Sequence, residues 1–470
     1  MGWLPRLPGP FSMSWRIALV YILVAGVQSF GNQTLLVSTE GSERATVGDG
    51  NKIISYQGKT HVVWQEVSRD GYLNQVRSYD HESKMWSKPV TLGKGIDNHA
   101  RPIITIDHRG YLHVILSGHN SPVMWRQSVR LNESSEWTEP VKVGEGTYPV
   151  VLCDRKNTLY LTMRANNHAG VDFYSKAENG PWALTSRIVK NAEEYREAYG
   201  AFHMGMALAP TGDIHAVIDF YEGQDKVGRG IHQAVCYVKS LDGGNTWRRA
   251  DGTLAKIPAR PEHMDIFARS TKTRVELTPR PEIRNLGIVV DSNDQPFVFY
   301  LSHAERPGQL LVMTLDDDQC WSERNLSPLL ESKWPDLRAT DGRTTIQEDD
   351  RICVLLTLSP YNDEWIQGRP SRAMSMKERT DERVVLLSSA DGGKSFEVQS
   401  ILSPGTAFNA PNLIQPVGAN QSDAVAVPLF LYFDGSRAYP AGEDYFKRPI
   451  LEILQAGEYW TNNVFLYGLQ

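Results

Sequence analysis

A short polar segment that occurs twice constrains the fold of this chain more than any other feature. The residues from Ser240 to Trp247 read SLDGGNTW, and those from Ser389 to Phe396 read SADGGKSF. Asp and Gly supply the backbone conformations of a tight hairpin turn, while the hydroxyl and carboxylate groups bond nearby backbone amides. The aromatic residue that ends each segment is expected to pack back into a sheet. Two copies in one chain indicate a repeat architecture.

Weaker copies of this pattern occur along the whole chain. Aromatic residues close a polar turn at six places, which are Trp86, Trp137, Trp182, Trp247, Trp321 and Phe396. Upstream of them lie apolar or alternating runs such as Gly58–Trp64 and Gly110–Leu116. About seven such units recur at roughly 50 residues, a spacing found in propeller blades. We therefore predict an all-β chain folded as a seven-bladed β-propeller, with a large β-sandwich or a β-helix as the alternative.

The first 30 residues have the pattern of a secretory signal peptide. Arg16 precedes the apolar run Ile17–Val27, and small and polar residues follow up to Gly31. A run of about a dozen residues is short for crossing a bilayer. We expect residues 1–30 to be a signal peptide, residues 31–470 to form a single β-propeller catalytic domain, and the protein to be secreted or periplasmic. A membrane anchor is the alternative, although stable membrane insertion is not expected.

Charge and cysteine content narrow the class of partner. The net charge is −6 and no basic run is present, so nucleic acid is not an expected partner. An acidic polysaccharide could still bind through a local basic cleft. The four cysteines are too few for a disulfide framework in a chain of this length.

The repeated turns invite comparison with sialidases. That chemistry requires an arginine cluster for the sugar carboxylate, a Tyr with a Glu partner and an acidic Asp. The Phe-Arg-Ile-Pro element found early in sialidases is absent, and Ala100-Arg101-Pro102 lacks its shape. The repeats therefore support a scaffold rather than that activity, because fold does not determine function.

Four polar residues lie at the ends of predicted strands in the second and third units. His99 and Tyr148 precede strands, whereas His119 and Arg164 follow them. If the units surround a common axis, these side chains come from adjacent units and face one cleft. Three other histidines lie inside predicted strands at one repeat position and are expected to be structural; they are His61, His113 and His215.

This set of side chains suits β-elimination from a uronic acid. The proton at C5 becomes acidic when the sugar carboxylate is neutralised, and the guanidinium of Arg164 can do so with two hydrogen bonds. A base then removes the proton and an acid protonates the leaving oxygen. His99 can fill one of these roles because imidazole titrates near neutrality, and Tyr148 the other. The assignment of acid and base between them stays open, and the chemistry needs no metal when Arg164 neutralises.

The stretch from Asp97 to Arg164 resembles ulvan lyases built on seven-bladed propellers with sialidase-type repeats. The resemblance rests on the Asn-His before a strand, the Gly-Tyr-Leu-His strand, the Ser-Gly-His-Asn after it, and the Tyr-to-Arg spacing. It implies a secreted polysaccharide lyase that acts on an ulvan-like glycan and leaves 4,5-unsaturated uronate ends. It also implies roles for seven residues: His99 and Tyr148 in catalysis, and His119, Asn120, Arg164, His168 and Tyr199 in substrate binding.

The same resemblance implies a structural zinc in some members. His232 and Cys236 are candidate ligands, with a place in the core as the alternative. Two other functions stay open beside the lyase. A propeller without activity could bind acidic sugars through Arg164, or a carboxylate pair formed by Asp97 with Glu145 or Asp172 could hydrolyse a glycosidic bond.

Overall fold

The computed structural model confirms an all-β chain: 56% of it is strand and 4% is helix. Besides Met1, it describes residues 33–48, 50–166, 170–190, 198–199, 204–224, 229–269, 283–302, 308–316, 318–360, 382–403, 409–421, 423–435 and 447–469. The predicted signal peptide falls almost wholly outside these residues. Within the described part, no helix has the length and apolar character needed to cross a membrane.

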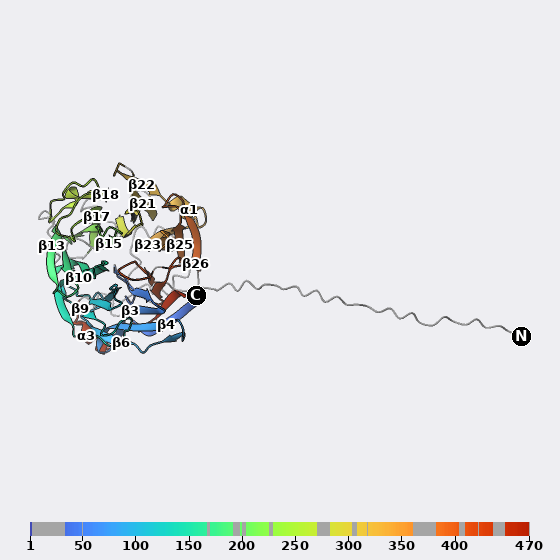
Figure 1. Cartoon of the computed structure of the whole chain (residues 1–470). Helices are drawn as coiled ribbons and strands as arrows, with labels where there is room; N and C mark the ends of the chain where they lie inside the picture. The colour runs from blue at the N-terminus through green and yellow to red at the C-terminus, as the bar shows by residue number, and fades with distance from the viewer. Residues whose placement is uncertain are drawn as a thin grey trace.

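The strands form five antiparallel sheets, which follow one another around a roughly circular outline in Figure 1. The first sheet has nine strands. Seven of them follow the order β27 (Asn409–Leu413), β28 (Phe430–Phe433), β29 (Asn462–Leu469), β1 (Gln33–Gly41), β3 (Lys59–Ser68), β4 (Gly71–Asp80) and β5 (Met85–Trp86), while β2 (Ile53–Tyr56) pairs with β3 and β6 (Val90–Gly95) pairs with β4. The second has the order β13 (Ala183–Lys190), β12 (Gly170–Lys176), β11 (Leu159–Ala165), β10 (Val141–Cys153), β9 (Ser121–Gln127), β8 (Leu112–Leu116) and β7 (Pro102–Ile106).

The remaining three sheets are smaller. One has the order β14 (Ala198–Tyr199), β16 (Ile214–Gln224), β17 (Arg229–Ser240) and β18 (Asp265–Arg269), with β15 (Met204–Leu208) beside β16. The next is β19 (Ile283–Val290), β20 (Pro296–Ser302), β21 (Gln309–Leu315) and β22 (Trp321–Asn325). The last is β23 (Leu337–Ile346), β24 (Ile352–Pro360), β25 (Arg383–Ser389) and β26 (Glu397–Leu402). Short helical segments are η2 (Pro261–His263), α1 (Ser327–Glu331) and α3 (Ile450–Gln455).

The first and last strands of the described residues pair with each other. Leu35 of β1 lies opposite Leu466 of β29, and Leu36 lies opposite Phe465. Two segments more than 400 residues apart in sequence therefore share one sheet. This pairing satisfies the backbone hydrogen bonds at both ends of the described domain.

The inner strands are buried along their whole length because both of their faces are covered, and most of their residues are apolar. Every residue of β7, β8 and β11 is buried. The largest core cluster joins neighbouring sheets, with members such as Ile54 of β2, Ile104 of β7, Val150 of β10 and Ile218 of β16. Packing of sheet against sheet explains why these strands read as continuous hydrophobic runs rather than as alternating ones.

The two polar repeats are turns that support the scaffold, as expected from the sequence. Ser240 Oγ accepts a hydrogen bond from the Gly244 amide at 2.8 Å, and Asp242 Oδ1 accepts one from the Thr246 amide at 2.9 Å. Trp247 is fully buried against Phe173, with ring centroids 5.3 Å apart. The second copy repeats the two serine and aspartate bonds with the amides of Gly393 and Ser395.

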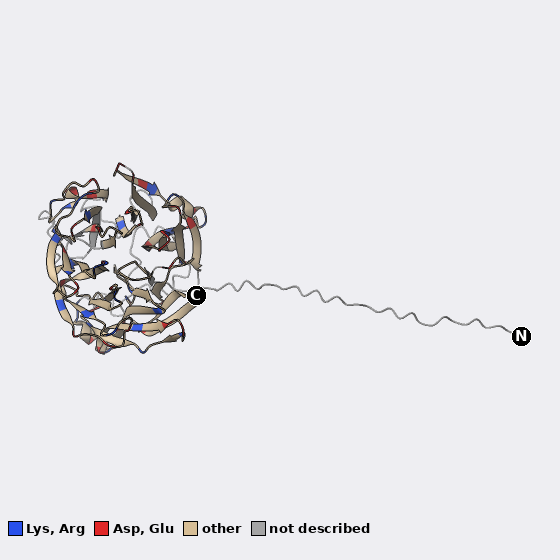
Figure 2. Ribbon diagram, viewed as in Figure 1, with Lys and Arg blue, Asp and Glu red and all other residues tan. Residues whose placement is uncertain are grey.

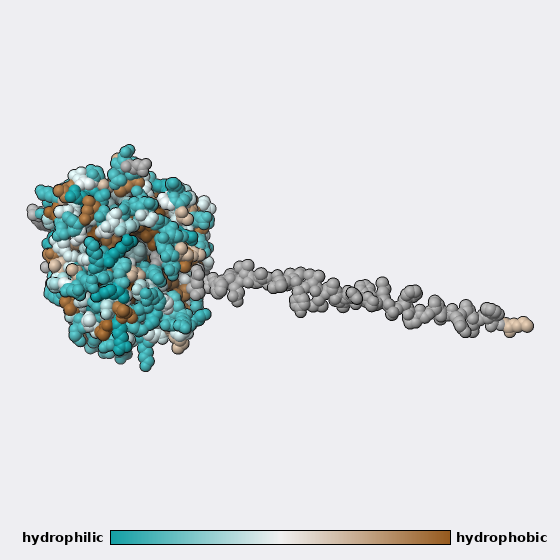
Figure 3. Space-filling view, in the orientation of Figure 1, coloured by the Kyte–Doolittle hydropathy of each residue, from teal (hydrophilic) through white to brown (hydrophobic). Residues whose placement is uncertain are grey.

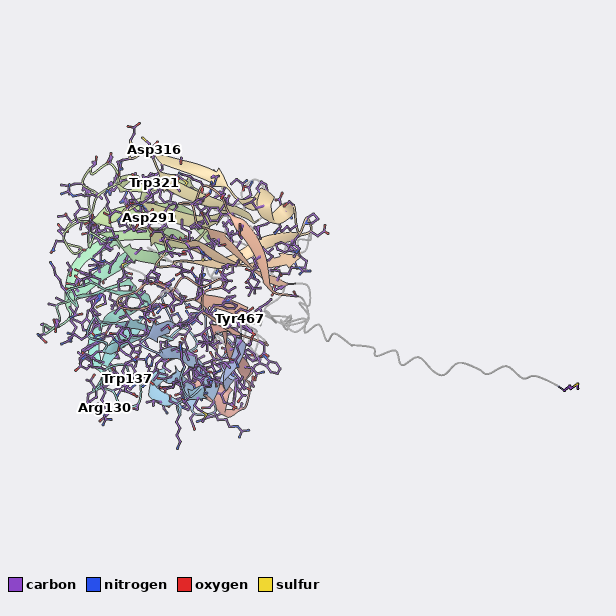
Figure 4. The ribbon with its side chains drawn as sticks, turned by 45° about the vertical axis from the view of Figure 1, so that its right-hand side comes forward. Arg130, Trp137, Asp291, Asp316, Trp321 and Tyr467 are labelled. Carbon is purple, nitrogen blue, oxygen red and sulfur yellow. The ribbon has the colours of Figure 1, made fainter. Side chains whose placement is uncertain are left out.

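Other turn-closing aromatic residues lie toward the outside of the molecule. Trp137, between β9 and β10, and Trp321 of β22 lie near opposite ends of the molecule in Figure 4, whereas Tyr467 of β29 lies between them. The repeat therefore places its turns away from the inner strands. The chemistry of this chain has to be sought elsewhere, at the ends of the inner strands.

Close packing at Gly244 makes a sharp test of the turn. Both glycines of the first repeat have a positive φ, but a Cβ on Gly244 would lie 2.1 Å from the Phe173 ring, whereas one on Gly243 would meet nothing nearer than 3.5 Å. Gly243→Ala should cost about 1 kcal/mol from the left-handed backbone alone. Gly244→Ala should lower the free energy of unfolding by about 2 kcal/mol more, because Phe173 has no room to move. Urea denaturation of both variants measures the difference, and equal losses would contradict it.

The surface is polar and its charges are mixed. Figure 3 shows a mainly hydrophilic face with separate small apolar patches. In Figure 2 basic and acidic residues are interspersed over the sheets rather than gathered by sign. Any binding of an acidic polymer therefore depends on a local arrangement of cations.

Candidate active site

Strand β10 turns sharply at the residue that the sequence singled out. Its first part pairs with β9, from Val141 opposite Trp125 to Gly146 opposite Ser121. Its second part pairs with β11, where the register skips between Thr147 and Val150. The extra residues form a bulge, and bulges commonly aim a side chain near a site.

Tyr148 lies in this bulge with a backbone conformation that bulky residues rarely adopt. Its φ is 56°, in the left-handed region. Such a conformation costs free energy, and the pairing of β10 with two neighbours at once holds it in place. The ring is partly exposed, whereas Thr147 and Pro149 beside it are buried. Local strain therefore presents one phenol at the surface of a rigid strand.

His99 and His119 stack on each other beside Tyr148. Pro102 of β7 pairs with Leu116 of β8, so the loop before β7 and the loop after β8 lie side by side. The two imidazole centroids are 4.0 Å apart and nearly parallel, and the centroid of the Tyr148 ring lies 6.4 Å from that of His99. The structure thus brings together three residues that the sequence predicted to share a site.

One carboxylate orients both imidazole rings. Asp97 Oδ2 lies 3.2 Å from His99 Nδ1 and 2.5 Å from His119 Nδ1, and Asp97 Oδ1 accepts the His99 amide hydrogen at 2.7 Å. An ionised carboxylate only accepts hydrogen bonds, so each Nδ1 carries the proton when the ring is neutral. The Nε2 atoms then hold the free lone pairs.

The ionisation of this cluster favours a neutral His99. Burial lowers the pKa of His99 well below its ordinary value, and the nearby charge of Arg44 adds to this, although Asp97 acts in the opposite direction. Burial alone would raise the pKa of Asp97, but hydrogen bonds from His119 and His99 outweigh it and hold that pKa below its usual range. A neutral imidazole beside an ionised carboxylate is the form that can accept a proton at Nε2.

Two guanidinium groups flank the phenol ring. Arg164, on β11 opposite Thr147, lies with its Cζ 4.7 Å from the centroid of the Tyr148 ring and is 2% exposed. Arg101, two residues after His99, lies 5.9 Å from the same centroid and is also buried. The structure therefore places Arg164 where the sequence expected it and adds Arg101 as a second cation.

Asn120 lies in the same loop as His119. Its φ is 51°, and its backbone amide donates to Thr147 Oγ1 at 2.9 Å, which ties this loop to β10 next to Tyr148. Its side-chain oxygen is buried and accepts no hydrogen bond from the described residues. Asn120 thus belongs to the group predicted from the sequence.

The two remaining candidates are not placed by the structure. His168 lies outside the described residues. Tyr199 belongs to the short strand β14, where it pairs with Tyr221, but its side chain is not described. Their predicted contacts with sugar stay predictions.

The three histidines predicted to be structural are buried among protein groups. His61 bonds Ser78 and Asn132, and burial lowers its pKa to about 4. His215 Nδ1 bonds the Tyr237 hydroxyl, and burial lowers its pKa to about 3. His113 lies 3.4 Å from Asp107 and is also buried. These partners confirm the prediction that the three rings support the sheets.

The carboxylates proposed for a hydrolytic pair have structural partners. Asp172 forms two hydrogen bonds with Arg187, and Glu145 bonds Lys142 and Asn166. Asp97 forms hydrogen bonds with His99 and His119. This arrangement disfavours hydrolysis by a carboxylate pair.

Sequence reasoning missed how Asp97, Arg101 and Arg44 contribute to the site. From the sequence, Asp97 is a candidate only for a hydrolytic carboxylate pair, and Arg101 only for part of a sialidase element. The spacing Asp-x-His, followed by a cation two residues later, is a pattern from which the roles of Asp97 and Arg101 beside His99 could have been predicted. No local pattern marks Arg44, because its effect on His99 depends on the packing of two distant loops.

A metal ion does not match the geometry of this cluster. Asp97, His99 and His119 form the group of metal-binding side chains that the described residues bring together. Tetrahedral zinc with bonds of about 2.0–2.1 Å separates its ligand atoms by roughly 3.3 Å. The 2.5 Å between Asp97 and His119 is instead a hydrogen-bond distance. Cys236 lies fully buried in the apolar core, where desolvation raises its pKa, and the side chain of His232 is not described. The cluster of Asp97, His99 and His119 thus does not fit tetrahedral zinc in this arrangement, and the structural zinc implied by the family resemblance stays a prediction.

Comparison with known proteins places the chain in a family of repeat proteins. Residues 54–328 match the BNR repeat-containing family, and the chain belongs to that family. This stretch covers more than half of the chain, including every member of the described cluster.

Within that family the chain is similar to ulvan lyases, which confirms the resemblance seen in the sequence. It is 23% identical over 352 residues to an ulvan lyase of Nonlabens ulvanivorans, covering 66% of this chain and 71% of the relative. It is 24% identical over 428 residues to the PL25 ulvan lyase of Pseudoalteromonas sp. (strain PLSV), covering 78% and 85%. An ulvan lyase of Alteromonas sp. (strain LOR) is 34% identical over 256 residues, 47% of this chain and 52% of the relative.

Solved structures share the fold. A PL25 ulvan lyase superposes with a TM-score of 0.65 at 18% identity, covering 86% of this chain and 93% of the other. A second structure, of a PL25 ulvan lyase bound to -[GlcA(1-4)Rha3S]-, has a TM-score of 0.64 at the same identity and coverage. The overall architecture is therefore shared with these structures of PL25 ulvan lyases.

Proposed function

We propose that this protein is a polysaccharide lyase that cleaves an ulvan-like, uronate-containing glycan by β-elimination. The observation that carries the proposal is the grouping of His99, His119, Tyr148 and Arg164, with Asp97 orienting both imidazole rings. These side chains supply a base, an acid and a fixed cation within reach of one sugar unit. The similarity to ulvan lyases supports the same activity.

His99 is assigned as the base. Its Nδ1–H faces Asp97, so its Nε2 lone pair can take the proton from C5 of the uronate. The imidazolium that forms gains from the charge of Asp97, whose low pKa keeps it ionised throughout. The electron pair of the broken C5–H bond then forms the C4–C5 double bond.

Tyr148 is assigned as the acid. Breaking the C4–O bond leaves an electron pair on the glycosidic oxygen, and the phenol supplies the proton that this oxygen takes up. The phenolate that forms faces Arg164 and Arg101, whose guanidinium groups balance its charge. The products are a sugar with a new hydroxyl group and a 4,5-unsaturated uronate.

Arg164 is assigned to the substrate carboxylate, with His119 and Asn120 beside it. A guanidinium matches a carboxylate through two parallel hydrogen bonds, and a buried one is held in place without further ordering. Neutralising the carboxylate stabilises the negative charge that develops at C5. In this scheme the chain's own residues supply all of the chemistry.

A seven-bladed propeller is the architecture we propose around this site. The nine-stranded sheet divides between β1 and β3, which share the single pair Gly41–Glu66, into β27–β28–β29–β1 and β2–β3–β4–β6. The seven-stranded sheet divides within β10, which serves two units in turn. Together with the three smaller sheets, these divisions give seven units of four main strands each, with the short strands β5 and β14 in addition. A crystal structure would test whether these units close a ring.

Residues 1–30 are proposed to direct the protein out of the cytoplasm. A polysaccharide too large to cross a membrane has to be met outside the cell or in the periplasm. N-terminal sequencing of the mature protein would test this, with a start near residue 31 expected.

The lyase proposal is tested by the product. Purified protein is incubated with a panel of uronate polysaccharides that includes ulvan, and absorbance is followed near 235 nm, where the conjugated uronate absorbs. Reducing ends that appear without this absorbance would indicate hydrolysis instead. Retention of the glycan without any cleavage would indicate a binding module.

The pH dependence of the rate tests the assignment of His99. Its pKa lies well below 6.5 in the free protein, so the neutral base persists as the pH falls through that value. We expect kcat/KM to stay on its plateau at pH 6.5 and to decline only at lower pH. Arg44→Gln removes one of the causes of the lowered pKa and should move this decline to higher pH. A shift in the opposite direction would exclude His99 as the group that titrates.

A further inference from the structure

A buried carboxylate lies behind the site and joins three segments of the chain. Glu43 follows β1 and is 3% exposed. Its Oε1 accepts hydrogen bonds from the Tyr72 hydroxyl at 2.9 Å and from Asn98 Nδ2 at 2.6 Å. Tyr72 belongs to β4, and Asn98 lies in the loop before β7. Both partners are buried, at 1% and 0% exposure.

Asn98 lies between two residues of the candidate active site in the loop before β7. Asp97 precedes it and His99 follows it, so the position of its side chain constrains the backbone on both sides. Its Nδ2 bonds Glu43, and its buried Oδ1 accepts no hydrogen bond from the described residues. The described structure therefore fixes this amide through Glu43.

The rest of the loop is tied to the same neighbouring strands. Gln65 Nε2 donates to the carbonyl oxygens of Asp97 and Ala100, both at 3.0 Å. Ser42 Oγ in turn donates to Gln65 Oε1 at 2.9 Å. The side chains of Ser42 and Glu43 thus both hold the loop. Ser42 acts through Gln65, which binds the loop carbonyls, and Glu43 acts through Asn98.

We propose that Glu43 is a positioning residue for the lyase reaction, acting through Asn98 to place Asp97 and His99 relative to Tyr148. This inference rests on the proposed function. Misplacement of a catalytic group by about 1 Å can lower a rate by roughly 100-fold. Loss of the Glu43 contact therefore affects turnover, although Glu43 is separated from the substrate by Asn98.

Burial of the carboxylate is consistent with this role. Desolvation raises the pKa of Glu43, and hydrogen bonds from Asn98 and Tyr72 oppose that rise only in part. A buried acid is costly unless its partners are fixed. Tyr72 is fixed by packing against Leu454 of α3 in a small core cluster.

The experiment compares Glu43→Gln with Glu66→Gln. Glu66 is also a carboxylate held by hydrogen bonds, from Ser38, Trp64 and Gln75, but none of these partners belongs to the loop of His99. Glu43→Gln should lower kcat about tenfold, because the NH2 group of glutamine cannot accept a hydrogen bond at a position surrounded by the donors Tyr72 and Asn98. The KM should stay within about twofold, because binding groups such as Arg164 stay in place. Glu66→Gln should keep the kcat of the unaltered protein. Equal kcat values for both variants would overturn the proposal.

A double variant tests the route through Asn98. Asn98→Ala alone should reproduce the loss, and Glu43→Gln combined with Asn98→Ala should lose no more than about twofold beyond either change. Independent, multiplying losses would overturn the proposed route. If Glu43→Gln fails to fold, the Asn98→Ala variant still decides, because full activity there contradicts the proposal.

A spectroscopic measurement separates this inference from the lyase activity. Protein labelled with ¹⁵N-histidine reports the imidazole nitrogens, and the His99 signals are identified by their loss in His99→Gln. They should shift in Glu43→Gln and stay unchanged in Glu66→Gln. If the unaltered protein cleaves no uronate polysaccharide, the proposed function fails while this shift still tests the contact. Unshifted His99 signals would overturn the positioning role.

Discussion

Replacing His99 with alanine should lower kcat by about 1000-fold, the largest effect expected of any single substitution. Removal of a general base from an elimination typically costs 10² to 10⁴ in rate. Here the imidazole stacks on His119, bonds Asp97 and lies edge-on to Tyr148, so no neighbouring group can take its position without rearrangement. The rate of increase in absorbance near 235 nm measures the change.

His108→Ala is the matched control for this substitution. His108 is exposed in the turn after β7, and only its backbone amide makes a hydrogen bond there, to Asn157. Its replacement should leave kcat unchanged. Combining His99→Ala with Tyr148→Phe should cost little more than the larger single loss, because base and acid act as one unit. Activity of His99→Ala close to that of the unaltered protein would remove His99 from the mechanism.

Replacing Arg164 with lysine should lower kcat/KM by about 100-fold. Lysine keeps the charge but offers a single ammonium group in place of the planar fork, so it cannot match a carboxylate with two parallel bonds. Loss of one fixed group that stabilises developing charge typically costs 10² to 10³. The substitution also removes a guanidinium that lies 4.7 Å from the Tyr148 ring.

Arg187→Lys provides the comparison. Arg187 forms its two hydrogen bonds with Asp172 of the protein itself, on strands β13 and β12. Losing these two parallel hydrogen bonds should change the free energy of unfolding slightly and leave kcat unchanged. If Arg164→Lys retained full kcat/KM while Arg187→Lys behaved as expected, a different residue would have to neutralise the uronate.

Polar residues beside the apolar runs could be predicted from the sequence because the repeat sets their positions, although Tyr148 lies within β10 and not before a strand as expected. His99, His119, Tyr148 and Arg164 each stand next to a recognisable apolar run, and register pairing between neighbouring strands brings such ends together. The closing pair of β1 and β29 was predictable for the same reason, since the last apolar run needs a partner.

Contacts made by loops from different units were beyond the reach of the sequence. The bond between Glu43 and Asn98 joins residues 55 positions apart, and no periodicity relates them. The left-handed φ of Tyr148 was equally hidden, because that conformation is uncommon for a tyrosine and follows from the pairing of β10 with two partners. Burial of Arg101 and the charge of Arg44 near His99 likewise depend on how the units pack.

The division of β10 between two neighbours has a consequence for motion. The described links from β1 to β2 and from β6 to β7 are loops, and a loop allows one group of strands to shift slightly against the next. Between β9 and β11 the connection is the continuous strand β10, whose first part pairs with β9 and whose second part pairs with β11, and Tyr148 lies at its bend. The phenol therefore stands on a strand that two neighbouring groups of strands share, where we expect the substrate to adapt to the protein rather than the protein to the substrate.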